Sequence, residues 1–306
     1  MLKSMNIKLV LGVLLFGGFI LISLIGPLIA PYEVDYNKKI GYTQTAEGQQ
    51  LVSSPFPPSQ EFKFGTDKWG YDILTLMLHG AKYTVLGTLL IAIARVLLGG
   101  IAGILMGLHK KKRTLRKATI SVWSGIPTFV IIYFIMVGIN INSSIPIWGL
   151  ILIQSVLMIF LGVSSVYNVI FSKTAEIKKE LYVVASISLG ASNNHIMVKH
   201  IWPALKGNIM IILINEAILV LHLIGQLGIF NLFFGGTHQQ FFPTIYLSVT
   251  HEWSGLIGQA RGFMYHSHWI ILFPLLAYIL FLFSLYLTSS GLSDLQVKKV
   301  RKASLL

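Results

Sequence analysis

The sequence has no cysteine and few charged residues. Of its 306 residues none is Cys, and Asp, Glu, Lys and Arg together make up only 11%. The absence of cysteine excludes disulfide bonds and thiolate metal sites. Soluble domains carry roughly 25% charged residues, so the scarcity of charge excludes an ordinary soluble domain. Hydrophobic residues make up 54% of the chain, which indicates an integral membrane protein.

Nucleotide-binding and catalytic motifs are also missing. The sequence contains no G-x-x-x-x-G-K-[ST] phosphate-binding loop, and none of its polar stretches is long enough for an ATPase domain. It also lacks H-E-x-x-H and G-x-S-x-G, which a membrane-embedded protease or lipid-modifying transferase would need. We therefore predict that this chain has no catalytic residues, and a membrane enzyme is the less favoured interpretation.

Six apolar segments are long enough to cross a bilayer as helices, which takes about 20 residues each. They lie at 7–30, 84–108, 118–140, 145–171, 209–230 and 269–289. The first resembles a signal peptide, but its apolar run is long and its end is a poor cleavage site. We interpret it as a retained span. The expected fold is therefore an all-α integral membrane protein with six transmembrane helices.

The distribution of basic residues predicts the orientation of these spans. The net charge is +13. If the N-terminus is cytoplasmic, most of the 24 Lys and Arg fall in the cytoplasmic tails and loops. The positive-inside rule favours this arrangement, which places both termini in the cytoplasm of a multi-pass cell-membrane protein. Because topology explains the basic excess, we expect no nucleic acid among the partners.

The stretch "KKELYVVASISLGASNNHIMVKHIWP", from Lys178 to Pro203, lies between two spans on the cytoplasmic side in this orientation. Its periodicity predicts two short helices separated by a bend at Gly190, with Ser192 capping the second. Pro203 is expected to end the unit before the next span. Such a unit would present a firm surface to a soluble partner. The alternative is an amphipathic loop that lies on lipid headgroups.

This stretch resembles the cytoplasmic "EAA" coupling loop of ABC importer permeases, in the version found in the oligopeptide/dipeptide/nickel permease family. The residues assigned to it are Glu180, Tyr182, Val183, Ala185, Ser186, Gly190, Ala191, Ser192, Ile196, His200 and Pro203. By this resemblance, the loop would dock into a groove on a separate ATPase subunit, with Ala185 and Ser186 at the contact.

A second stretch, "FGTDKWGYDILTLMLHGAKYTVL" from Phe64 to Leu86, is similar to that family's extracellular segment before the second span. Its matching positions include Gly65, Thr66, Asp67, Gly70 and Asp72. "EWSGLIGQARGFMYHSHWIILFP" is similar to the family's last extracellular loop and sixth span. The sequence also departs from the family: Tyr71 and Leu76 replace arginines, and Ser186 replaces the second alanine of the triplet.

The resemblance covers about residues 1–300, is closest to the C-type subunit, and implies the type I ABC importer permease fold with a cytoplasmic coupling helix. The expected organisation is an N-terminal transmembrane helix at 1–31 and an extracellular segment with an amphipathic helix at 32–81. The permease domain then covers 82–290, with its coupling loop at about 174–206, and a cytoplasmic tail covers 291–306. Implied partners are a homologous second permease subunit, two ATPases that carry ATP and Mg, and an extracellular substrate-binding protein. No cofactor is expected on this chain.

Four polar residues within the predicted spans are candidates for the pathway. Arg95 and Glu216 are expensive at membrane depth unless paired or hydrated, so they either contact substrate or form an internal pair. His222 and Gln226 share a helix face at i, i+4 spacing, which suits bundle hydrogen bonding or a pathway role. The glycines Gly99, Gly103 and Gly107 recur every four residues, which predicts a close helix–helix contact.

The resemblance leaves the substrate open. Peptides are the first expectation, and nickel or a metallophore is the second. A sensor or assembly subunit that transports nothing would keep the same fold. His266 and His268 form an H-x-H pair near His251 and Glu252, but an H-x-H pair needs further ligands to bind zinc. We interpret the two histidines as interfacial and predict no metal site. Asp67 and Asp72 are expected to brace the extracellular segment.

Overall fold

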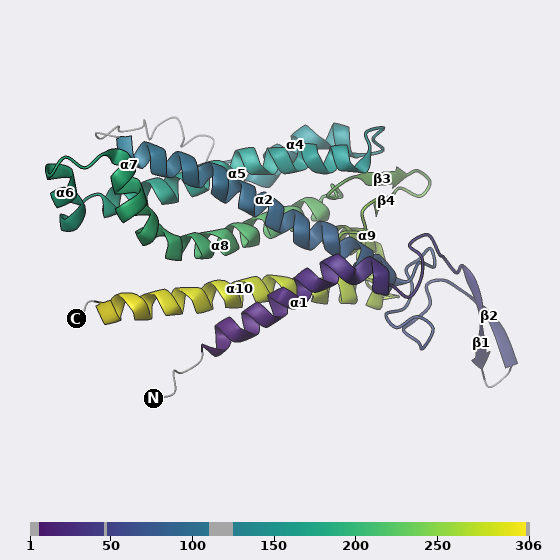
Figure 1. The fold of residues 1–306 in the computed structure, drawn as a ribbon. Coiled ribbons are helices and arrows are strands. Elements are labelled where there is room, and N and C mark those ends of the chain that lie inside the picture. The colour runs from purple at the N-terminus through teal and green to yellow at the C-terminus, as the bar shows by residue number, and fades with distance from the viewer. Residues whose placement is uncertain (1–5, 46–47, 110–124, 304–306) are drawn as a thin grey trace.

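The computed structural model describes residues 6–45, 48–109 and 125–303. Its helices lie side by side along one axis (Figure 1). The start of α1 (Ile7–Ile29), the end of α10 (Trp269–Ala303) and the short helices α6 (Leu181–Ser188) and α7 (Asn193–Ile196) lie at one end of this bundle. Two small hairpins and α9 (Trp253–Ala260) lie at the other end (Figure 1). The arrangement confirms the predicted all-α membrane bundle.

The long helices are α1 (Ile7–Ile29), α2 (Ile73–His109), α5 (Ile147–Ile177), α8 (Trp202–Ile229) and α10 (Trp269–Ala303). The shorter ones are α4 (Thr128–Asn140), α6 (Leu181–Ser188), α7 (Asn193–Ile196) and α9 (Trp253–Ala260). A π-helical turn covers Met197–Ile201 and a 3-10 turn covers Arg261–Phe263. Two antiparallel hairpins are formed by β1 (Ile40–Thr45) with β2 (Gly48–Ser53), and by β3 (Thr237–Gln240) with β4 (Ile245–Ser248).

Five of the described helices are long and apolar enough to cross a membrane: α1, α2, α5, the continuous run through α7 and α8, and α10. The third predicted span, 118–140, corresponds to α4, which has 13 residues. Positions 118–124 of that prediction lie outside the described residues. The helices α1, α2, α4, α5, α8 and α10 alternate in direction along the bundle (Figure 1), as six crossings require.

Glycines set the contact between α2 and α5. A Cβ at Gly99, Gly103 or Gly107 would collide with α5 at Val166, Ile170 and Thr174 respectively. Because glycine has no side chain, the two backbones can approach closely. Dispersion contacts between the helices then stabilise the pair, since the hydrophobic effect does not drive helices together within lipid. The packing role predicted for these glycines is confirmed. The same principle holds α1 against α10, where Gly12 meets Thr288 and Gly291 meets Leu9.

The first turns of α2 and the second span form one continuous helix. The sequence predicts an amphipathic helix in the segment 32–81; Ile73, Leu76 and Met77 are buried and belong to the same helix as the span. A Cβ at Gly80 would strike the carbonyl oxygen of His251, and the indole Nε1 of Trp253 donates to Met77 O at 2.9 Å. This end of α2 is therefore enclosed by α9 and the chain before it.

The position of Pro203 differs from the prediction. It lies in the first turn of α8, which begins at Trp202, seven residues before the predicted span. Proline is tolerated there because a first-turn N–H has no partner within the helix. The coupling segment therefore continues through the π-helical turn into α8 without a break at Pro203.

Candidate functional site: the coupling segment and the polar groups of the bundle

The coupling segment consists of α6, a glycine bend and α7, as the sequence predicted. Gly190 has φ of +85°, a left-handed conformation that a residue with a Cβ disfavours. Ser192 caps α7, its Oγ accepting from the N–H of His195 at 3.3 Å. The bend returns the chain toward the bundle, so α6 forms the outermost part of this end of the molecule (Figure 1).

Three apolar side chains anchor the segment to the bundle. Val183 of α6, Ile196 of α7 and Ile201 of the π-helical turn are each at most 1% exposed. They join one apolar cluster with residues of α2, α5 and α8, among them Leu108, Val166, Ile170 and Leu205. Lys178 adds a polar tie, because its Nζ donates to Leu108 O. The segment is therefore packed against three long helices at once.

The opposite face of the segment is apolar and uncovered. Leu181 is 87% exposed and Leu189 is 89% exposed, and Ala185 between them is exposed as well. Val184 and Ile187 are 44% and 40% exposed. Contiguous exposed apolar side chains on a firmly anchored helix mark an interaction surface.

Ser186 is turned inward. Its Oγ lies 3.0 Å from His200 Nε2 and donates to Tyr182 O at 3.1 Å. The ring of Tyr182 lies 5.5 Å from that of His200. Sequence reasoning placed Ser186 with Ala185 on the docking contact, whereas its hydroxyl connects α6 to the π-helical turn. Glu180 and Ala191 flank α6, with Glu180 exposed and Ala191 half-buried.

Arg95 and Glu216 form a buried ion pair. Arg95 Nη1 of α2 lies 3.2 Å from Glu216 Oε2 of α8, and the guanidinium also donates from Nε at 3.0 Å and Nη2 at 2.6 Å to Met158 O of α5. Each residue is 4% exposed. Gly162 makes room, since a Cβ there would occupy the guanidinium position. Of the two interpretations that the sequence left open, this geometry supports the internal pair.

His222 and Gln226 line a different space. They share a cavity of about 240 Å³ with Arg261 and Tyr278, and both side chains are exposed in the single chain. Tyr278 Oη donates to Leu221 O at 2.6 Å, which ties α10 to α8 beside it. The structure thus does not bring His222 and Gln226 to the Arg95–Glu216 pair. It places them on an open face of α8.

The motif that contains Gly65, Thr66, Asp67, Gly70 and Asp72 is held by hydrogen bonds within the segment. Asp72 Oδ2 accepts from Thr75 N at 2.8 Å and from Thr75 Oγ1 at 2.7 Å, which caps the start of α2. Thr66 Oγ1 accepts from Phe56 N at 2.8 Å. Gly65 and Gly70 have φ of +75° and +89°, which glycine adopts without strain.

Asp67 is a buried acid of this motif that borders a cavity. It is 3% exposed, and its Oδ1 accepts from Trp69 N and Tyr71 N, both at 2.9 Å. Burial raises the pKa of Asp67 to about 7 against these backbone hydrogen bonds, which lower it. The side chain therefore holds the loop through Oδ1, and its other carboxyl oxygen, Oδ2, faces away from these two donors.

Sequence reasoning missed the role of Glu252. It is fully buried and caps α9, with Oε2 accepting from Ser254 N at 2.8 Å. Burial raises the pKa of Glu252 to about 7. The available signal was its position directly before a helix-forming run, where an acidic side chain caps free N–H groups. Beside it, burial lowers the pKa of His251 to about 4, with a smaller contribution from His79.

The histidine pair is not part of a cluster. His266 and His268 are exposed, and the ring of His268 lies 5.7 Å from that of Trp269. Across residues 6–45, 48–109 and 125–303, no three His, Cys, Asp or Glu side chains lie where they would hold a metal ion.

The six-helix arrangement and the anchored, outward-facing α6 define a membrane transport permease. The chain matches the model of the binding-protein-dependent transport system inner membrane component over residues 95–302 and belongs to that family, the permease subunits of ABC importers. It is a multi-pass membrane protein and a transport subunit.

Relatives agree with this assignment. The chain is 31% identical over 150 residues to the inner membrane ABC transporter permease protein YejE of Escherichia coli, over 49% of this chain and 42% of that protein. It therefore spans less than half of YejE. It is 26% identical over 288 residues to the peptide transport system permease protein SapC of Haemophilus influenzae, over 91% and 88%. A putative peptide transport system permease protein of Brucella suis is 25% identical over 246 residues, over 78% and 74%.

Proposed function

We propose that this chain forms half of the translocation pathway of an ATP-driven peptide importer and works by alternating access. The observation that carries the proposal is the pairing of an uncovered apolar face on α6 with buried anchors beneath it. Peptides are the proposed substrate because SapC and the Brucella suis relative are named as components of peptide transport systems.

In this proposal α6 docks into a groove on a separate ATPase subunit. Leu181, Ala185 and Leu189 supply the apolar contact, and the small Ala185 side chain lets the partner approach closely. ATP binding would close the ATPase dimer and pull two coupling helices together. Because Val183, Ile196 and Ile201 tie the segment to α2, α5 and α8, the pull would rock the bundle as a rigid body.

The remaining parts of the system lie on other chains. A homologous second permease subunit would complete the pathway, with His222 and Gln226 on the open face of α8 toward it. ATP and Mg would be held by two ATPase subunits, and this chain would bind no cofactor. The end that carries α6 and both termini would face the cytoplasm. An extracellular binding protein would deliver substrate to the opposite end.

Substitutions on the exposed face of α6 test the proposal. Leu189→Glu and Ala185→Trp alter the exposed face, and Leu51→Glu is the matched control because Leu51 is 63% exposed on β2 at the other end. We expect the α6 variants to lose copurifying ATPase and ATP-dependent peptide uptake by about tenfold or more, as when an interface anchor is removed. Leu51→Glu should retain both. Wild-type ATPase retention and uptake in Leu189→Glu and Ala185→Trp would refute the docking role.

A further inference from the structure

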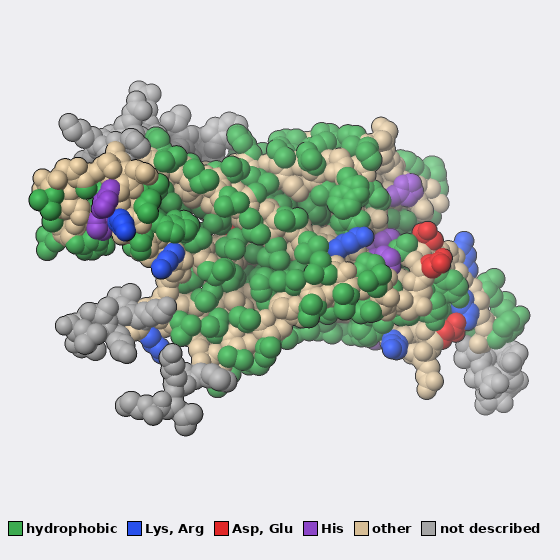
Figure 2. Space-filling model, viewed as in Figure 1, with side chains coloured by type: hydrophobic (Ala, Val, Ile, Leu, Met, Phe, Trp, Pro, Cys, Tyr) green, Lys and Arg blue, Asp and Glu red, His purple; other side chains and the backbone are tan. Residues whose placement is uncertain are grey.

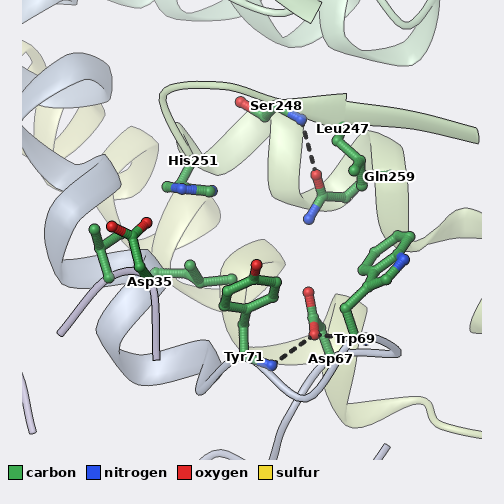
Figure 3. Close-up of a pocket in the computed structure, with 10 residues that line it drawn as sticks. Asp35, Asp67, Trp69, Tyr71, Leu247, Ser248, His251 and Gln259 are labelled. Atoms are coloured by element: carbon green, nitrogen blue, oxygen red, sulfur yellow. Dashed lines mark hydrogen bonds between the residues drawn. The ribbon is translucent and has the colours of Figure 1, made fainter. Parts of the chain in front are cut away.

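A second cavity, of about 190 Å³, lies at the end of the bundle opposite α6. Four segments that are distant in sequence close around it (Figure 3). Asp35 comes from the chain after α1, the loop from Asp67 to Tyr71 precedes α2, Ser248 ends β4, and His251 and Gln259 belong to the α9 region. None of these segments alone forms a binding site, so the cavity is a product of the tertiary fold.

The cavity wall holds a buried carboxyl group. Asp67 is 97% buried, and its Oδ1 accepts from Trp69 N and Tyr71 N. The other carboxyl oxygen, Oδ2, points into the cavity (Figure 3). Across from it, Gln259 Oε1 accepts from Ser248 N at 3.0 Å, which leaves the amide nitrogen of Gln259 directed into the same space (Figure 3).

The described lining of the cavity has acidic side chains and no lysine or arginine. The two carboxyl groups are those of Asp35 and Asp67. Tyr71 contributes a phenol, and the indole of Trp69 forms an aromatic wall (Figure 3). His251 does not compensate, because burial holds its pKa at about 4 and keeps the ring neutral near pH 7.

Neighbouring lysines are engaged elsewhere. Lys38 Nζ lies 2.6 Å from Glu61 Oε1, Lys68 Nζ lies over the ring of Phe263 at 5.2 Å, and Lys82 Nζ lies over the ring of Tyr83 at 5.0 Å. None of the three lines the cavity. The described part of the chain thus builds a polar, aromatic-walled, acidic cavity and supplies no cation to it.

We propose that this cavity binds one cationic group of a peptide chain: a lysine ammonium, an arginine guanidinium or a terminal ammonium. A buried carboxylate is costly unless it is paired, and a charge-assisted hydrogen bond from such a group to Asp67 Oδ2 would provide the pair. Aromatic faces favour the same ligand by cation–π attraction. The group belongs either to a transported peptide or to a side chain of a docked extracellular protein, and both sources offer the same chemistry.

Calorimetry on the purified full chain in nanodiscs tests the site without requiring transport. The probes are N-acetyl-argininamide, N-acetyl-lysinamide and, as the neutral isostere, N-acetyl-citrullinamide. We expect the two cations to bind and the neutral probe not to bind. Asp67→Asn retains the acceptor for Trp69 and Tyr71 and should weaken cation binding at least tenfold. Asp294→Asn, a carboxyl change at the other end of α10, should have no effect.

A second variant keeps the test decisive if Asp67→Asn folds poorly. Gln259→Glu retains the acceptor for Ser248 N and replaces the amide nitrogen with a carboxyl oxygen, so it should strengthen cation binding severalfold. Equal binding of the citrulline probe, no binding of either cation, or unchanged binding in both Asp67→Asn and Gln259→Glu would overturn the proposal.

Uptake in the assembled complex distinguishes the two sources. If the group belongs to the transported peptide, Asp67→Asn should reduce uptake of lysine- or arginine-containing peptides and spare neutral ones. If it belongs to a docked protein, uptake of all peptides should fall together, with weaker capture of that protein. Failure of peptide uptake in the wild type would count against the proposed function, whereas the calorimetric result would still decide the cavity.

Discussion

Arg95 and Glu216, which are 121 positions apart in the chain, meet at 3.2 Å between α2 and α8. The guanidinium also donates to the Met158 carbonyl of α5, so one side chain joins three helices inside the bundle. Both residues are almost wholly buried. The pair therefore fixes the relative position of the helices that the coupling segment would move.

Breaking this pair from one side should be more harmful than removing it. Glu216→Ala leaves a buried guanidinium without its counter-ion and is expected to destabilise the chain by about 3 kcal/mol or more. Arg95→Met combined with Glu216→Met should recover most of that loss, because an apolar pair fills the space. Thermal unfolding followed by size-exclusion chromatography measures both. A double variant less stable than Glu216→Ala would contradict the prediction.

Two adjacent glycines of α2 should respond oppositely to alanine. Gly99→Ala drives a Cβ into Val163 and Val166 of α5 and should cost about 1–3 kcal/mol. Gly100→Ala meets nothing within 4 Å and should be neutral or stabilising by about 0.5–1 kcal/mol. Comparative thermal unfolding of the two variants is the measurement. Equal melting temperatures would show that α2 and α5 do not pack at Gly99.

Glu252 should make stability depend on pH. Its pKa is about 7 in the folded chain and near 4.5 when exposed, so the folded state favours the protonated form. The stabilisation is complete below pH 4.5 and is lost as the pH rises through 7, a change on the order of 3 kcal/mol. Relative to Glu252→Gln, the wild type should melt progressively lower between pH 5 and pH 7. A constant difference across that range would exclude the titration.

The absence of native cysteine allows a direct test of orientation. Single-cysteine variants Phe241→Cys, in the β3–β4 hairpin, and Val297→Cys, near the end of α10, replace exposed side chains at opposite ends. A membrane-impermeant maleimide should label Phe241→Cys in intact cells and Val297→Cys only after permeabilisation. Labelling of Val297→Cys in intact cells would reverse the proposed topology.

Figure 2 shows why the sequence predicted the class of protein so directly. Hydrophobic side chains (green) cover the flank of the bundle. The charged side chains (blue and red) gather toward its two ends (Figure 2). Span length depends on bilayer thickness, and loop charge depends on the membrane side, so both can be recognised from local composition. The α6–glycine–α7 unit was predictable for the same reason, since Gly190 and the Ser192 cap act within a few residues.

The sequence by itself determined the membrane class, the position of the coupling segment and the small-residue face of α2, because each depends on spacing within one segment. Only the tertiary structure decided that Arg95 pairs with Glu216, that Ser186 turns inward to His200, and that an Asp67 oxygen opens into a cavity with Gln259. These relationships depend on how helices rotate and cross relative to one another. Hydrophobic periodicity fixes which face of a helix is buried, but it does not specify which distant side chain that face meets.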